Sequence, residues 1–185
     1  MKNIRLTKFH RKLPSLFHQR GASLLEGIAY LGIAALIILG AISLLTTAFS
    51  SAQSNSMESQ VISIRTAARK LYQTQTSGYG VAGADLTPIL INAGAFPPSM
   101  VNGTSVTNAW NGAVTVAVDA TVTQFTITYL LVPKQVCIDM YSNGGTANGW
   151  VAVKVGTGAF TAAPTPLLAN TACAGATNTI VLQSS

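Results

Sequence analysis

The sequence predicts an α+β fold in which a long N-terminal α-helix packs on a C-terminal antiparallel β-sheet. Residues 27–57 carry no charged side chain, and residues 27–45 are almost wholly apolar. Apolar residues then recur every three or four positions as far as Leu71, which is typical of an amphipathic helix. Beyond residue 112, two runs rich in β-branched residues are typical of strands.

The positive charge of the chain is concentrated in residues 1–21, a basic leader. Six of the eleven Lys and Arg residues lie there and no Asp or Glu does, whereas residues 22–185 carry five charges of each sign. Nucleic-acid binding requires a basic surface. Because residues 22–185 are neutral overall, we expect no nucleic-acid partner.

The side chains that usually perform catalysis are scarce beyond the leader. Both histidines, His10 and His18, lie within it, so residues 22–185 have no imidazole to act as a general base or metal ligand. The carboxylates are scattered, and no base is placed to activate a Ser or Thr. We therefore expect no enzyme activity, no catalytic residue, no metal site and no cofactor.

The uncharged run predicts a membrane-spanning helix over residues 22–50, since about 20 apolar residues cross the hydrocarbon layer. The basic leader would keep the N-terminus in the cytoplasm. Three interpretations remain open. The run is a secretory signal cleaved near Ser50, a signal anchor for a periplasmic binding domain, or the retained helix of a precursor that is cleaved before it.

The stretch RGASLLEG, residues 20–27, favours the third interpretation. It resembles the processing site of type IV prepilins, which has a basic leader, a Gly at the cut and a Glu at the fifth mature position. Here the cut would fall between Gly21 and Ala22, and Glu26 would be the fifth residue. The long leader and the non-Phe first residue resemble the type IVb subgroup, which includes bundle-forming, toxin-coregulated and conjugative thin pilus major pilins.

This resemblance implies a function and a set of partners. A prepilin peptidase would remove residues 1–21, and Ala22 would be N-methylated. The subunit would wait in the inner membrane of a Gram-negative bacterium until an assembly platform and its ATPase added it to a helical homopolymer. The extracellular pilus, or fimbrium, would serve adhesion, aggregation or conjugation. A pseudopilin of a type II secretion system is the alternative that shares the N-terminal motif.

Glu26 has two interpretations. A carboxylate in the first turn of a helix is stabilised by the positive end of the helix dipole, so Glu26 is tolerated near the headgroups without a further role. Alternatively, cleavage creates a cationic amine on Ala22, and Glu26 of one subunit pairs with that amine on its neighbour. The resemblance implies the second interpretation, which makes Glu26 an assembly residue.

The helix is expected to continue through an amphipathic half over residues 51–77. Its buried stripe would comprise Met57, Val61, Ile64, Ala68 and Leu71. Ser77–Gly80 would end it. Two glycines in the apolar half, at positions 32 and 40, either allow close helix packing or mark a segment that melts on assembly.

Residues 78–185 are expected to form the globular part of a pilin fold. A short helix is predicted over Pro88–Ala93, with Thr87 as its N-cap, and another from Pro133 to Tyr141. The predicted strands, about four in one antiparallel sheet, are Ala113–Val118, Thr121–Leu131, Trp150–Val155 and Thr179–Gln183. Residues 156–176 are expected to be a loose stretch rich in Gly, Ala and Thr.

Cys137 and Cys173 are the only cysteines. If residues 78–185 lie in the periplasm, the two thiols are in a compartment where disulfides form, although two free buried thiols remain possible. In the pilin family a late cysteine pair encloses a variable region, and these positions resemble it. The resemblance thus implies a disulfide between Cys137 and Cys173.

Overall fold

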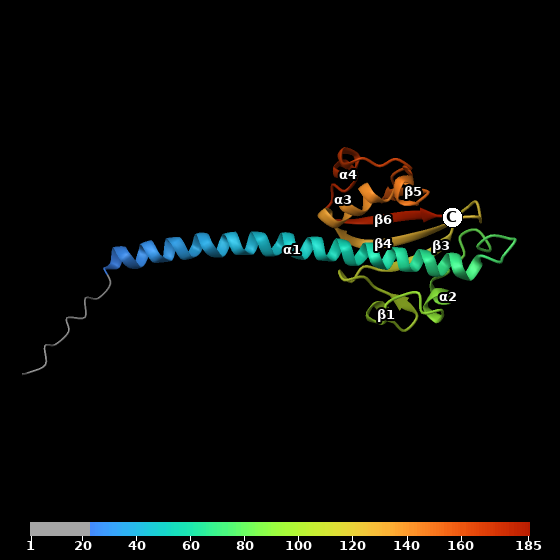
Figure 1. Ribbon diagram of the computed structural model, residues 1–185, viewed down its shortest axis with the longest axis horizontal. Helices are drawn as coiled ribbons and strands as arrows, with labels where there is room; N and C mark the ends of the chain where they lie inside the picture. The colour runs from blue at the N-terminus through green and yellow to red at the C-terminus, as the bar shows by residue number, and fades with distance from the viewer. Residues whose placement is uncertain (1–22) are drawn as a thin grey trace, which may run out of the picture. The chain divides into compact units, whose positions relative to one another are not determined.

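The structure, a computed structural model, describes residues 23–185 (Figure 1). Helix α1 (Leu24–Tyr72) belongs to two compact units, one ending at Ser43 and one comprising Leu44–Ser185. In the first unit α1 is continuous through Gly32 and Gly40, and no atom outside the local helix lies within 4 Å of where their side chains would begin. The second unit, which we call the head, contains the C-terminal part of α1 and every other element.

The head is built from short helices and strands that follow α1. Its helices are α2 (Thr87–Asn92), α3 (Lys134–Asn143) and α4 (Pro166–Ala172), with 3-10 turns at Pro98–Met100 and Thr146–Asn148. Its strands are β1 (Val101–Asn102), β2 (Ser105–Val106), β3 (Val114–Val118), β4 (Phe125–Pro133), β5 (Ala152–Val155) and β6 (Thr177–Ser184). Within the head, Figure 1 shows α3 and α4 on one side of α1 and α2 with β1 on the other.

The main sheet has four antiparallel strands in the order β3-β4-β6-β5. Strand β6 therefore lies between β4 and β5, which precede it in the chain. The pairing of β4 with β6 shifts register between Tyr129 and Val132, and Leu131 within this bulge adopts a φ of 57°. The predicted α+β class, with a long helix on an antiparallel sheet, is confirmed.

Four residues of α1 enter the core of the head: Met57, Val61, Ile64 and Ala68 are each 2% exposed or less. They pack with the inward-facing residues of the sheet, among which Phe125, Ile127 and Tyr129 are fully buried. The predicted stripe is confirmed up to Ala68. Leu71 was wrongly included, because its side chain is 41% exposed.

Helix α1 ends at Tyr72, five residues before the predicted end at Ser77. The chain leaves the helix because Tyr79 is held by the head instead. Its ring contacts the rings of Tyr72 and Phe125, with centroids 5.3 and 4.8 Å away, and its N–H donates to the Val122 carbonyl at 2.8 Å. Gly78 allows this return at a φ of 74°, and a side chain there would collide with the same carbonyl.

Two local predictions need correction. Thr87 is not an N-cap, because it is the first residue of α2. Its hydroxyl accepts from Val116 N–H at 2.9 Å, and the N–H of Thr87 donates to the Asp85 carboxylate at 2.8 Å. The stretch 156–176 is not wholly loose, since it contains α4. Thr165 caps α4 by accepting from Leu168 N–H at 3.3 Å, and Pro166 occupies the first helical position, where its missing N–H costs nothing.

Candidate assembly surface and disulfide-closed region

The start of α1 carries the candidate assembly residue Glu26. Ser23 precedes the helix, and its carbonyl accepts from Glu26 N–H at 2.9 Å while its hydroxyl accepts from Leu25 N–H at 3.3 Å. The Glu26 carboxylate accepts one long hydrogen bond, from the Tyr30 hydroxyl at 3.4 Å. Gly21 and Ala22, the predicted cleavage pair, lie outside the described residues.

Large apolar side chains cover α1 from its first residue to Phe49, and all of them are exposed. The exposed fractions run from 53% at Ile42 to 85% at Leu24. By length and composition this helix could cross a membrane. An apolar surface of this extent is not stable in water, so it requires lipid or other protein as its surroundings.

Polar contacts hold the next part of α1 within the head. Ser54 donates to the Asp139 carboxylate of α3 at 2.9 Å, and Gln135 donates to the same group at 3.3 Å. On the other side of the helix, the side-chain amide oxygen of Gln53 accepts from the indole N–H of Trp110 at 3.1 Å. The helix is thus fixed on both sides just where its apolar surface ends.

Further along α1, Arg65 reaches across to the loop before β5. Its guanidinium lies 4.8 Å from the ring centroid of Trp150 and donates to the Asn148 carbonyl at 3.4 Å. Gly149, at a φ of 78°, leaves room for it, since a side chain there would meet a guanidinium nitrogen at 3.0 Å. Partial burial, with a smaller contribution from the charge of Arg69, lowers the pKa of Arg65 below its ordinary value. The contact combines cation–π attraction with packing of the Arg stem.

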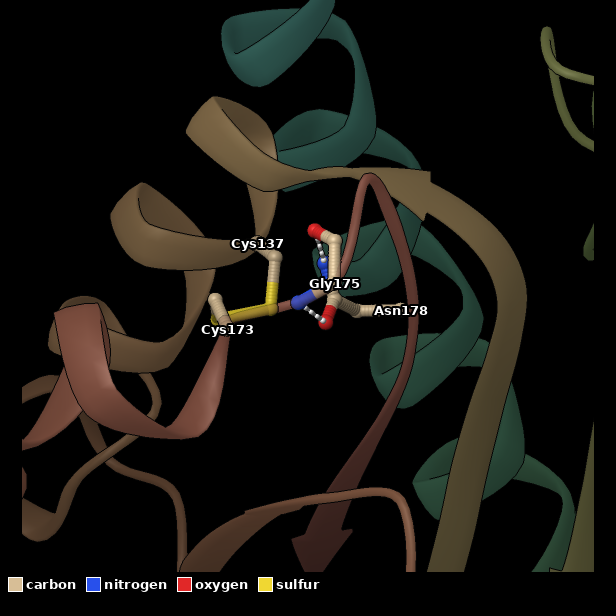
Figure 2. The surroundings of a disulfide bond; sticks show 4 residues. All are labelled: Cys137, Cys173, Gly175 and Asn178. Atoms are coloured by element: carbon tan, nitrogen blue, oxygen red, sulfur yellow. Dashed lines mark hydrogen bonds between the residues drawn. A yellow bond between two sulfur atoms is a disulfide. The ribbon is translucent and has the colours of Figure 1, made fainter.

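Cys137 and Cys173 form a disulfide that joins α3 to the end of α4 (Figure 2), as the resemblance implied. Their Cα atoms are 5.9 Å apart, and both residues are fully buried. Figure 2 shows Gly175 and Asn178 beside the bond, where the chain turns into β6. The Asn178 amide donates to the Gly175 carbonyl at 2.9 Å, and its oxygen accepts from the Gly175 N–H at 3.3 Å.

Within residues 23–185, no group of three or more His, Cys, Asp or Glu side chains is arranged to hold a metal ion. Of the predicted site residues, the structure describes Glu26 at the start of α1 and the cysteine pair in the head. Sequence reasoning missed the Arg65–Trp150 contact and the Asn178 turn. A cation–π pair separated by this much of the chain leaves no local signal, whereas the Ala-Gly-Ala-Thr-Asn stretch at 174–178 does indicate a turn.

Comparison with known proteins supports one family. A family model described as PilS N terminal matches residues 51–185. A crystal structure of a type IVb pilin from Salmonella typhi is similar with a TM-score of 0.51 and 22% identity, over 67% of this chain and 96% of that one. An NMR structure of the type IVb pilin PilS from Salmonella typhi is similar with a TM-score of 0.47 and 25% identity, over 70% of this chain and 94% of that one. No curated protein matches the chain.

The match to the family model covers most of the chain, including the whole sheet and both cysteines. The fold agrees: a long N-terminal helix packs on an antiparallel sheet, and the crystal structure of the Salmonella typhi pilin shares this architecture. The exposed apolar start of α1 and the disulfide are features that the sequence had led us to expect of such a protein. The chain belongs to the PilS family and has the fold of a type IVb pilin.

Proposed function

We propose that the chain is the precursor of a pilus subunit, cut between Gly21 and Ala22 by a prepilin peptidase and N-methylated at Ala22. The part of α1 that precedes the head first anchors the subunit in the inner membrane, with the N-terminus in the cytoplasm, and then becomes part of the filament core. The observation that carries this proposal is the exposed apolar surface from Leu24 to Phe49. Lipid covers it before assembly, and the same helices of neighbouring copies cover it afterwards.

The polymer grows from the inner membrane on an assembly platform driven by an ATPase. Extrusion replaces helix–lipid contacts with helix–helix contacts, and packing of side chains favours the latter. The heads face water and carry the adhesive or conjugative function of the filament. The parts of the chain are then the leader 1–21, the membrane and core helix 22–50, the amphipathic segment 51–77 and the globular region 78–185.

Glu26 sets the axial register of the polymer in this proposal. The only hydrogen bond of its carboxylate within residues 23–185 is the long one from Tyr30, so this group can still accept from a second donor. The methylated amine of Ala22 in a neighbouring copy is positively charged and would be that second donor. In surroundings of low dielectric the two ions attract strongly, and pairing offsets part of the cost of removing each from water.

The first test is the mass of the mature protein. A subunit that begins with methylated Ala22 supports the proposal, whereas one that retains Met1 is a signal-anchored protein. A subunit that begins near Ser51 is a secreted protein. Shearing the cells then distinguishes a pilus, which is released into the medium, from a pseudopilus, which stays with the cell.

The second test replaces Glu26. We expect Glu26→Ala to leave a processed subunit in the inner membrane and to abolish filaments seen by electron microscopy, because the cationic amine loses its partner. Tyr30→Phe is the matched control, since it removes the internal hydrogen bond and leaves the carboxylate. Normal filaments from Glu26→Ala, or their loss in Tyr30→Phe alone, would contradict the assembly role of Glu26.

A further inference from the structure

The charged residues of the head are not paired with one another. Within residues 23–185 no Lys or Arg nitrogen lies within 4.0 Å of a carboxylate oxygen. Three of the four head carboxylates accept hydrogen bonds from polar groups: Asp85, Asp119 and Asp139. The side chain of Glu58, exposed on α1, has no hydrogen bond in the part of the chain that the structure describes. The side chain of Lys70, near the end of the same helix, likewise has no hydrogen bond and no ring contact within residues 23–185.

Glu58 and Lys70 lie on different faces of α1. Glu58 lines an open groove of about 450 Å³ with residues 138–143 of α3, which places it on the α3 side of the helix. At about 100° per residue, Lys70 lies about 120° further around the helix, away from the buried stripe. The exposed face beside it carries Ser56 and Ser63, with the half-buried Gln60 at its edge. Lys70 is the only charge on that face within the head.

A polymer of parallel subunits can bring these two faces together. Subunits anchored by the same helix in the same membrane are parallel, and neighbours in a helical polymer contact each other through different surfaces. The α3 side of one copy and the Ser56–Lys70 face of the next are two such surfaces, and they carry opposite charges. We propose that Glu58 of one subunit pairs with Lys70 of a neighbouring copy and fixes the axial stagger between their heads. The inference rests on the proposed polymerisation.

The separation of the two residues gives the stagger. They are twelve positions apart in α1, or about 18 Å at the helical rise. At this stagger Asp139, which is held level with Ser54 by its hydrogen bond, adds a second negative charge on the face that meets Lys70. Arg65 and Arg69 of the first copy lie beyond the end of the neighbour's α1, so neither opposes Lys70.

The polar surroundings are compatible with this contact. Below Glu58, the α3 side of the first copy is lined by Ser51, Ser54 and Asn55. At the same stagger Ser51 comes level with Ser63 of the neighbour's face and Ser54 with the exposed Thr66, so hydroxyl groups face each other there. One exposed ion pair contributes little, but it recurs at every subunit of the filament, and like charges there repel at every subunit.

Charge reversal tests the pairing. Glu58→Lys and Lys70→Glu are made singly and together, and filaments sheared from cells are measured relative to subunit in the membrane. We expect each single reversal to lower the yield roughly tenfold and the double reversal to restore it to within about twofold, since only the double variant regains opposite charges. Arg69→Glu is the matched control, with the same charge change one residue away on the α3 side, and should assemble normally.

The outcomes separate this inference from the proposed function. If the unchanged chain makes no filaments, the proposed function fails. If it does, single reversals that assemble normally overturn the Glu58–Lys70 pairing, and so does a double reversal that accumulates in the membrane without regaining filaments. A cross-linking test is independent of yield: Glu58→Cys with Lys70→Cys should give a ladder of covalent multimers, and Glu58→Cys with Arg69→Cys should not.

Discussion

Tyr129 places a phenol hydroxyl in the centre of the head. Its side chain is fully buried, and its hydroxyl has no hydrogen-bond partner among the described protein groups. Burial raises the pKa of Tyr129 above its ordinary value, because the anion would lose its hydration there. The ring fills the core between Val114 and Ile180, its cross-strand partners, so Tyr129 contributes packing at the cost of an unsatisfied polar atom.

Replacing Tyr129 by Phe keeps the ring and removes the hydroxyl. We expect Tyr129→Phe to raise the free energy of unfolding by about 1 kcal/mol, because a buried unsatisfied hydroxyl is itself destabilising. Chemical denaturation at neutral pH measures this change. Tyr72→Phe, at a partly exposed ring, is the control and should change little. A loss of stability in Tyr129→Phe would mean that its hydroxyl has a partner.

Tyr129 also predicts a dependence of stability on pH. Its folded-state pKa is raised, so above about pH 10 the unfolded chain releases a proton that the folded chain keeps. Its contribution to stability is therefore complete below pH 10 and is lost as the pH rises further. We expect unfolding curves recorded between pH 8 and 11 to show a smaller alkaline loss in Tyr129→Phe than in the unchanged chain.

At the scale of elements, the disulfide holds α4 against α3. Helix α4 has seven residues, too few to be stable alone, and two of its large side chains, Leu167 and Leu168, are 78% and 47% exposed. Ala169 within α4 and Cys173 directly after it are buried in the core. The bond therefore supplies much of what keeps α4 in place, whereas Thr161 is held separately by two hydrogen bonds exchanged with Val153.

We expect Cys137→Ser with Cys173→Ser to lower the free energy of unfolding by about 3–4 kcal/mol on the loop-entropy model. Limited proteolysis should then cut first between residues 156 and 176, and fragment masses locate the cut. The unchanged chain treated with a reductant serves as a second route to the same state. Equal protease resistance with and without the bond would show that α4 is held by packing alone.

Most of these elements were predictable because their signals are local. The alternation of β-branched residues located β3 and β4, and the apolar period located the buried stripe of α1 up to Ala68. The errors occur where distant groups decide. Helix α1 ends early because Tyr79 packs on Phe125, and residues 121–124 form a turn rather than strand because Asp119 N–H bonds to the Gln124 carbonyl at 2.9 Å.

The candidate site was predictable to the same extent. Glu26 and the cysteine pair stand in recognisable sequence contexts, so both could be named, and the pairing of the cysteines is now shown. Glu58, Lys70 and the groove beside α3 could not be named from sequence. Their roles depend on which faces of α1 the head covers, and α3, which lines the groove with that helix, comes much later in the chain.

At the scale of the whole molecule, the buried core begins well after the apolar surface of α1 ends. Every fully buried residue of that helix lies at Met57 or beyond, and the contacts of Gln53 and Ser54 with the head also fall after residue 50. The family match covers the same region, residues 51–185. The head thus contains its own core without the apolar segment.

We expect a shortened chain that begins at Ser51 to fold as a soluble monomer and to form no filaments, because it keeps the core and lacks the apolar surface. Size-exclusion chromatography and a cooperative thermal transition measure this. A chain that begins at Ile62 is the control, since it loses Met57 and Val61 and should not fold. Aggregation of the longer fragment would mean that residues before Ser51 are part of the folding unit.

The position of β6 in the sheet has a consequence for export. Strand β6 joins β4 to β5, yet it follows both in the chain, and β5 pairs with no other strand of the main sheet. In the proposed pathway, the helix of a subunit that is crossing the membrane can insert long before its sheet can close. Chains interrupted before residue 177 would be anchored but unfolded, exposed to proteases, and so removed before they reached a growing fibre.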